Sequence, residues 1–212
     1  MTTAHLWLIR HGQTDWNLQG RWQGQTPHAP PLNTTGLAQA HTLATTLAQQ
    51  AAHIPFRAIY SSDLTRAHQT AAILAARLGL DVRCDPRLRE VNLGAWEGML
   101  GEDVARRYPE MLDERRRNPV HARPPCGETV LELATRMSQA LTDIANAHPD
   151  ENVIIVSHGL AIAAARCIAH GIPLAQIFDH LPDHATPYCV TWRCQCGHKR
   201  VAAHRRIDIC TE

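Results

Sequence analysis

The sequence has little net charge and no long apolar run. Its 212 residues include 21 lysine and arginine and 20 aspartate and glutamate side chains, a formal net charge of +1. Such a charge creates no global field that would attract nucleic acid or an acidic membrane surface. No window approaches the roughly 18 apolar residues of a membrane span, and residues 1–5 lack the features of a signal peptide. We therefore expect a cytoplasmic protein without nucleic-acid or membrane partners.

The sequence also lacks a disulfide framework, because its seven cysteines are scattered and odd in number. A group of cysteine and histidine side chains near the C-terminus raises the alternative of a zinc site. Its members are Cys189, Cys194, Cys196, His198 and His204. The Cys-x-Cys spacing and the absence of a Cys-x-x-Cys pair favour a hairpin turn with free thiols. We expect no metal ion and no cofactor.

Short apolar runs alternate with amphipathic stretches along the chain. Predicted strands cover residues 6–9, 58–60, 81–84, 153–156, 188–193 and 201–206, predicted helices cover 35–50, 64–78, 129–147 and 160–170, and 15–33 is expected to be a loop. Ser61 and Ser62 are candidate caps of the second helix, and Gly79 its end. This alternation predicts an α/β fold, a three-layer α/β/α sandwich around a mostly parallel sheet.

The chain is expected to form one domain over residues 1–212, with a core large enough to be stable without disulfides or metal. Residues 98–127 differ from the rest, because they contain the arginine runs 106–107 and 115–117 and several prolines. We interpret this segment as a small helical insertion that covers the active site. The arginine run 115–117 is either a solvated helix face or a basic rim that attracts a multiply charged substrate.

Two of the predicted strands end in the same dipeptide. Arg10-His11-Gly12 follows the first strand, and Ser157-His158-Gly159 follows a buried one. Because the carboxyl ends of parallel strands face the ligand crevice of an open α/β sheet, both histidines are expected to meet there. Arg66, after a third strand, and Glu90 are expected to join them.

These residue types suit phosphoryl transfer. A glycine such as Gly12 is expected to let the backbone approach the ligand closely. His11 can attack phosphorus only when neutral, and nearby Arg10 and Arg66 lower the pKa of such an imidazole. The same cations balance the charge of the phosphoryl group. Glu90 is the natural general acid, provided that it carries a proton or shares one with the substrate phosphate. The backbone N–H at Gly159, which opens a helix, adds an anion site.

Six segments of the chain match motifs of one family, in order. They are Leu-Ile-Arg-His-Gly-Gln-Thr-Asp-Trp-Asn at 8–17, Arg-Trp-Gln-Gly-Gln at 21–25, Pro-Leu-Asn-Thr-Thr-Gly at 31–36, Tyr-Ser-Ser-Asp-Leu-Thr-Arg-Ala at 60–67, Leu-Arg-Glu-Val-Asn-Leu-Gly-Ala-Trp-Glu-Gly at 88–98 and Val-Ser-His-Gly at 156–159. Each motif is weak alone, but together they are specific. With them the chain resembles the histidine phosphatase superfamily, on its phosphoglycerate-mutase-like branch.

The resemblance implies roles for individual residues. His11 would be the phosphorylated nucleophile, and Glu90 would protonate the leaving group. The other residues implied in phosphate binding are Arg10, Arg66 and His158, which would complete the pocket, and Asn17, Gln23 and Gly24, which match positions that line the substrate phosphate.

The resemblance implies a metal-independent phosphatase that acts on a small phosphorylated metabolite. Two alternatives remain, a phosphoglycerate mutase primed by a bisphosphoglycerate and, less favoured, a non-catalytic protein that binds a phosphorylated ligand. The sequence does not identify the alcohol part of the substrate. Residues 98–127 and the proline-rich loop 26–31 are expected to determine it. A homodimer formed through an edge strand is a further expectation.

Overall fold

The computed structural model describes residues 2–194 and contains a five-stranded sheet of order β3-β2-β4-β1-β5. The strands are β1 (Thr3–Arg10), β2 (Phe56–Ser61), β3 (Val82–Cys84), β4 (Asn152–Ser157) and β5 (Pro187–Arg193). β4 pairs in parallel with both β1 and β2, β2 pairs in parallel with β3, and only β5 is antiparallel to its neighbour β1. The mostly parallel sheet predicted from the sequence is confirmed, although the predicted strand at 201–206 lies outside the described residues.

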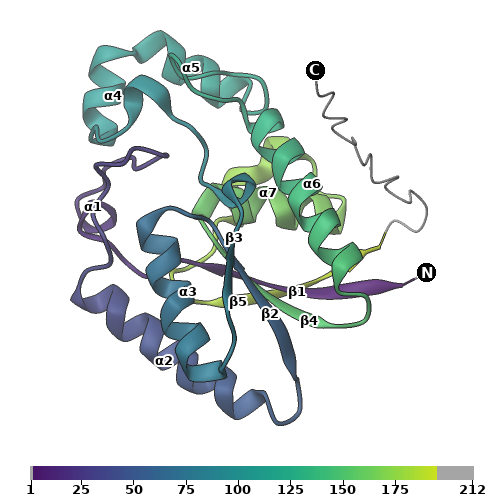
Figure 1. Cartoon of the computed structure of the whole chain (residues 1–212). Helices are drawn as coiled ribbons and strands as arrows, with labels where there is room; N and C mark the ends of the chain where they lie inside the picture. The colour runs from purple at the N-terminus through teal and green to yellow at the C-terminus, as the bar shows by residue number, and fades with distance from the viewer. Residues whose placement is uncertain (1, 195–212) are drawn as a thin grey trace, which may run out of the picture.

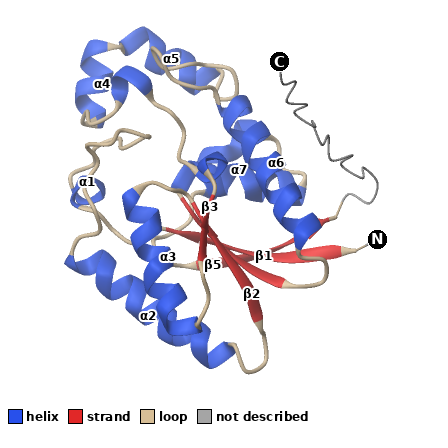
Figure 2. Ribbon diagram, viewed as in Figure 1, coloured by secondary structure: helices blue, strands red, loops and turns tan. Residues whose placement is uncertain are grey.

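Helices cover both faces of this sheet, which completes the three-layer arrangement (Figures 1 and 2). α2 (Thr34–Gln50) and α3 (Thr65–Leu78) pack on one face, and α6 (Val130–Ala147) and α7 (Gly159–His170) on the other. In β4 the side chains of Ile154 and Ile155 point to opposite faces and belong to different hydrophobic clusters. This explains why the strand is apolar without interruption.

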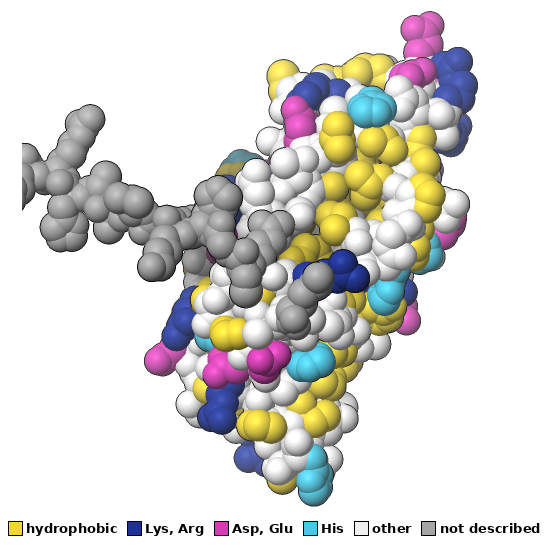
Figure 3. All heavy atoms as spheres, turned by 90° about the vertical axis from the view of Figure 1, so that its right-hand side faces the viewer, with side chains coloured by type: hydrophobic (Ala, Val, Ile, Leu, Met, Phe, Trp, Pro, Cys, Tyr) yellow, Lys and Arg dark blue, Asp and Glu magenta, His cyan; other side chains and the backbone are white. Residues whose placement is uncertain are grey.

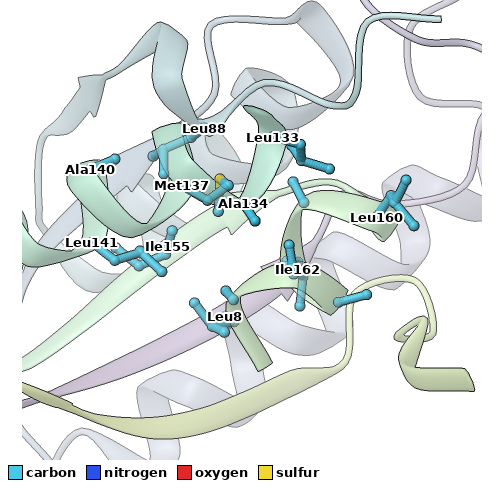
Figure 4. Close-up of a cluster of buried hydrophobic side chains, with 14 of the residues drawn as sticks. Leu8, Leu88, Leu133, Ala134, Met137, Ala140, Leu141, Ile155, Leu160 and Ile162 are labelled. Atoms are coloured by element: carbon cyan, nitrogen blue, oxygen red, sulfur yellow. The ribbon is translucent and has the colours of Figure 1, made fainter. Parts of the chain in front are cut away.

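The larger cluster lies between α6, α7 and the sheet (Figure 4). Leu133, Met137 and Leu141 follow one another along the buried face of α6, at the spacing of an amphipathic helix. They meet Leu8 of β1 and Ile155 of β4, and all five side chains are fully buried. This packing fixes α6, the helix that precedes β4, against the sheet.

The helix ends agree only in part with the sequence prediction. Gly79 ends α3 in the left-handed conformation, with φ of 68°, as predicted. The serine caps were wrong, because Leu64 is the N-cap of α3 and no side chain caps it. The predicted loop at 15–33 contains a short helix, α1 (Asp15–Leu18), stabilised by a capping box between Thr14 and Asn17.

Residues 98–127 contain two helices, α4 (Gly101–Arg107) and α5 (Pro109–Arg117). Figure 1 shows both away from the sheet, at the end of the molecule where α1 follows β1. The backbone of Trp22 donates to Met99 O at 3.0 Å and accepts from Gly98 N at 2.7 Å, which joins the segment to the α1 loop. Residues 2–194 also contain three 3₁₀ helices: Pro86–Leu88, Gly94–Trp96 and Leu174–His180.

Several other expectations concern the surface and the C-terminus. No helix in residues 2–194 combines the length and apolar character needed to cross a membrane. Figure 3 shows hydrophobic side chains gathered in a band on one face of the molecule. The homodimer expected from the sequence stays a prediction. The five cysteines in the described part of the chain are free thiols. Of the predicted C-terminal hairpin, Cys196, His198 and His204 lie outside the described residues.

Candidate active site

The parallel pairing of β1 and β4 brings the two His-Gly dipeptides together. Arg10 lies opposite Ser157 in the register, and His11 N donates to Ser157 O at 3.0 Å. The rings of His11 and His158 follow directly and lie edge to face, with centroids 5.1 Å apart. The sheet edge predicted to hold both histidines does so.

The hydrogen bonds of His11 fix its tautomer. Nδ1 lies 2.7 Å from the carbonyl oxygen of Gly12, which can only accept, so Nδ1 carries the proton. On the other side of the ring, Arg66 Nε donates to His11 Nε2 at 3.2 Å. Because a guanidinium can only donate, Nε2 holds a lone pair. The imidazole is neutral, with its unprotonated nitrogen beside a cation.

Burial and nearby charges keep His11 neutral. The side chain is buried, and this desolvation is the main reason why the pKa of His11 lies well below its ordinary value of 6.5. The positive charges of Arg66 and Arg10 and the ring of His184 lower the pKa further, while the hydrogen bond to Gly12 opposes them. The expected effect of the two arginines is therefore present but smaller than that of burial.

The two arginines are held from different elements. Arg66, in the first turn of α3, is buried and donates from Nη2 to Gly24 O at 2.9 Å. Burial lowers its pKa to about 10, and the carboxylates of Glu90 and Glu97 oppose this change. Arg10, at the end of β1, donates from Nη1 to Pro182 O at 2.9 Å, whereas its buried Nε has no partner in the described part of the chain.

His158 is the N-cap residue of α7 and is completely buried. Its Nε2 and the hydroxyl of Ser62 are 2.8 Å apart, and the same hydroxyl accepts from Leu64 N at 3.3 Å. Its Nδ1 has no hydrogen-bond partner among the described residues. Burial above all, with Arg66 and His11 next, lowers the pKa of His158 well below its usual range.

Glu90 lies against the N-terminus of α7. Its Oε1 accepts from Val91 N at 2.9 Å and from Ala161 N at 3.2 Å, and its Oε2 accepts from Leu160 N at 3.2 Å. A Cβ at Gly159 would lie 3.7 Å from Oε2 and 3.5 Å from the Arg10 guanidinium, so these three groups are adjacent. Because Glu90 binds two of the amides, the anion site predicted at this helix end is already partly occupied.

The residues expected to line the phosphate are held by local contacts. Gln23 donates from Nε2 to Thr14 Oγ1 at 2.9 Å, while its buried Oε1 has no partner in residues 2–194. Asn17 accepts from Thr14 N at 3.0 Å. Gly24 has φ of 52°, and its Cα faces the side chain of Glu97 so closely that no Cβ would fit.

Gly12 has a different role from the one expected. A Cβ at Gly12 would lie 2.5 Å from Gly36 O, so the missing side chain allows α2 to approach β1. The position does not line the pocket.

These groups surround one pocket of about 310 Å³. Of the candidate site residues, eight line it: Arg10, His11, Asn17, Gln23, Gly24, Arg66, Glu90 and Gly159. His158 lies behind them and contacts the ring of His11. A larger hollow of about 690 Å³ beside α6 contains no histidine and a single arginine, Arg87. Within residues 2–194, no cluster of three or more His, Cys, Asp or Glu is placed to hold a metal ion.

The structure adds residues to the site that the sequence reasoning did not identify. His184 donates from Nδ1 to His11 O at 2.8 Å, and its ring lies 5.4 Å from that of His11. Arg115 of α5 and Phe178 of the last 3₁₀ helix line the pocket, whereas no residue of the loop 26–31 does. The arginine run 115–117 was the only signal available for Arg115, and nothing in the sequence marks His184 or Phe178.

Known proteins resemble this chain over most of its length. The family model of the histidine phosphatase superfamily (branch 1) matches residues 6–203. A phosphoserine phosphatase 1 of Hydrogenobacter thermophilus is 32% identical over 179 residues, 84% of this chain and 82% of that protein. A probable phosphoglycerate mutase of Escherichia fergusonii is 34% identical over 168 residues, 79% of this chain and 75% of that protein.

Solved structures give the same result. A mycobacterial glucosyl-3-phosphoglycerate phosphatase, solved as a complex with VO3, superposes with a TM-score of 0.76 at 31% identity, over 87% of this chain and 90% of that one. The fold of this chain thus has a counterpart in a solved phosphatase structure.

Proposed function

From the membership of this chain in branch 1 of the histidine phosphatase superfamily, we propose that it hydrolyses a small phosphomonoester through a phosphohistidine on His11. Its relatives include proteins named as phosphatases and as phosphoglycerate mutases. The observation that carries this proposal is the lone pair of His11 Nε2, which Arg66 Nε and Gly12 O define by their hydrogen bonds. A buried neutral imidazole beside a cation is a nucleophile whose target is an anion.

In the first step, His11 Nε2 forms a bond to phosphorus while the bond from phosphorus to the alcohol oxygen breaks. Arg10, Arg66 and His158 stabilise the charge on the phosphoryl oxygens. The buried nitrogens of Arg10 and His158 that lack partners among the described residues support this role, because such groups are normally paired. Asn17, Gln23, Gly24 and the amide of Gly159 complete the phosphate site.

Glu90 transfers the protons. Its carboxyl group protonates the departing alkoxide, either with its own proton or with one taken from the substrate phosphate. The resulting carboxylate then accepts a proton from water, whose oxygen bonds to phosphorus as the bond to His11 breaks. The adjacency of Glu90 to Arg10 and Gly159 in the pocket supports this assignment. The cationic groups supply the charge that a metal ion would otherwise supply, which makes the proposed reaction metal-independent.

Residues 98–127 act in this proposal as a cap on a single domain, because Arg115 of that segment lines the pocket.

A second candidate is a mutase that transfers the phosphoryl group back to the same substrate. The 34% identity to a probable phosphoglycerate mutase favours it. The chain has Arg-Glu-Val-Asn-Leu-Gly at 89–94, where the family resemblance leads us to expect Glu-Arg-His-Tyr-Gly in mutases primed by a bisphosphoglycerate, and this difference supports the phosphatase.

The test is phosphate release from a panel of phosphomonoesters in the presence of a chelator, with 3-phosphoglycerate isomerisation followed in parallel. We expect release that His11→Asn abolishes. Glu90→Gln should slow alkyl phosphates more than 4-nitrophenyl phosphate, whose leaving group needs no proton. Full activity of His11→Asn would contradict the proposal, and isomerisation in excess of release would favour the mutase.

A further inference from the structure

Arg115 is a cation in the pocket that the proposed chemistry does not use. It lies on α5 and lines the same cavity as His11, Arg10 and Arg66. We propose that Arg115 binds a second anionic group, carried by the alcohol part of the substrate. The inference rests on the proposed phosphatase function and deepens it, because it assigns the substrate to the phosphomonoesters that bear another negative charge.

Aromatic rings hold the guanidinium in place. Its Cζ lies over the rings of Trp22, Trp96 and Phe178, at 5.6, 5.7 and 5.4 Å from their centroids. The three rings come from the α1 loop, from a 3₁₀ helix and from the segment after α7. A guanidinium stacked on ring faces is stabilised by cation–π attraction and keeps its N–H groups for a planar anion.

Within residues 2–194, Arg115 makes no hydrogen bond and no ion pair, unlike its neighbours. On the same helix Arg116 pairs with Asp113 at 2.8 Å, and Arg117 pairs with Glu114 at 3.5 Å. Asp113 and Glu114 of α5 are therefore engaged by Arg116 and Arg117 and not by Arg115. Burial lowers the pKa of Arg115, with Glu90 opposing the change. A partly desolvated cation without a counter-ion is a binding site for an anion.

Each of the other arginines of the pocket donates to the protein, and Arg10 keeps its Nε, unpartnered within residues 2–194, for the phosphoryl group. Arg66 donates to His11 and Gly24, and Arg10 donates to Pro182. Arg21, which also lines the pocket, donates to Gly98 O at 2.8 Å and to Gln19 Oε1 at 2.9 Å. The phosphate site is complete without Arg115, so its charge suits a different part of the substrate.

The space beside Arg115 accommodates that part. A second hollow of about 400 Å³ is bounded by Trp22, Arg115 and Phe178, which also line the first. Arg115 therefore borders both hollows, and the inference places the second anionic group of the substrate beside its guanidinium. A carboxylate and a second phosphate are both compatible with this arrangement, because each offers oxygens to the N–H groups of a guanidinium.

The test compares matched phosphomonoesters of increasing length. In one series, each ω-phosphorylated hydroxy acid is paired with an alcohol phosphate of equal length whose far end is a hydroxymethyl group. In the other series, each alkanediol bisphosphate is paired with the corresponding monophosphate. We expect the wild type to prefer the anionic member at one or more lengths. Arg115→Met should lower kcat/KM for those substrates by about 10- to 100-fold, through KM, because a hydrogen bond to a charged group is lost. The neutral members should be nearly unaffected.

Two further variants separate recognition from stability. Arg117→Met, at an exposed position of α5 that lines neither hollow, should change neither class of substrate. Arg115→Lys should restore part of the preference, since it keeps the charge. Equal losses for both classes in Arg115→Met would indicate a purely structural role and overturn the inference, as would the absence of any preference in the wild type.

Failure of the proposed function gives a different result. If the wild type releases no phosphate from any probe, including 4-nitrophenyl phosphate, the phosphatase assignment is wrong. The inference about Arg115 is then tested by calorimetric binding of the same pairs. A difference in affinity between anionic and neutral members that Arg115→Met abolishes would support it, and equal affinities would overturn it.

Discussion

At the scale of single residues, His11 was predictable and its environment was not. The motif predicted a histidine at the end of β1, beside arginines. Its tautomer depends on the carbonyl of Gly12 and on the exact reach of Arg66 from α3. Such contacts depend on how β1 and α3 pack, and local sequence patterns do not report that packing. The same holds for His184 and Ser62, which touch the two histidines without belonging to a recognisable pattern.

Gly12 gives the first prediction. The residue was expected to allow close approach of a ligand, whereas its missing Cβ allows close approach of Gly36. Gly12→Ala should therefore destabilise the protein by about 1–3 kcal/mol, as overpacking does, with the midpoint of urea unfolding as the measurement. Gly101→Ala is the control, because its Cβ would lie 3.4 Å from Trp22 Nε1, an ordinary contact. An unchanged midpoint for Gly12→Ala would contradict the packing role.

At the scale of elements, α6 positions the loop that carries Glu90. Arg136 of α6 donates to the carbonyls of Arg87, Arg89 and Glu90 at 2.7, 2.6 and 2.8 Å. It also binds Glu128, with Nη2 to Oε1 at 2.5 Å. The sequence predicted the helix from its apolar periodicity. The function of a polar residue on that helix could not be predicted, because its partners lie 46 to 49 residues away.

Arg136 gives the second prediction. If it positions Glu90 as the acid, Arg136→Met should slow hydrolysis of alkyl phosphates much more than that of 4-nitrophenyl phosphate, which needs little protonation. Steady-state kcat/KM on the two substrates measures the difference. Arg136→Lys, which keeps the charge beside Glu128, should retain part of the activity.

Arg123→Met is the matched control for this prediction, because Arg123 pairs with Glu132 of the same helix at the surface. Equal losses on both substrates in Arg136→Met would show that Arg136 acts on stability alone.

At the scale of the whole molecule, the alternation of strands and helices and the paired His-Gly dipeptides were sufficient to predict the fold and the edge that holds the site. The segment 98–127 was predicted to be a helical insertion, and it contains the helices α4 and α5, while residues 118–127 are not helical. Arg115 nevertheless enters the pocket only because three rings from distant parts of the chain surround it. Contacts of this kind arise from tertiary packing. The sequence therefore predicts the chemistry of the site better than it predicts the substrate.

The three histidines around the site give a third prediction, on the stability of the whole protein. His11, His158 and His184 all have a pKa lowered in the folded state, with burial as the largest cause. The unfolded chain therefore binds protons below pH about 6.5 that the folded chain does not bind. The free energy of unfolding should fall as the pH drops from about 6.5 toward 5, by up to about 1.4 kcal/mol per pH unit for each histidine.

Urea unfolding at a series of pH values measures this slope. His184→Gln should reduce it, and His41→Gln, a change at an exposed position of α2, serves as the control. A stability that is constant over this range, or that rises as the pH drops, would contradict the assignment of buried neutral histidines.

The most direct test of the central claim is to trap the phosphoenzyme. The protein is mixed with a good phosphomonoester substrate, quenched with denaturant at alkaline pH within the first turnovers, and examined by intact mass and by peptide mapping. We expect one added phosphoryl group on His11, labile to acid and absent from His11→Asn. Rapid turnover without any phosphorylated histidine, or with the label on another residue, would contradict it.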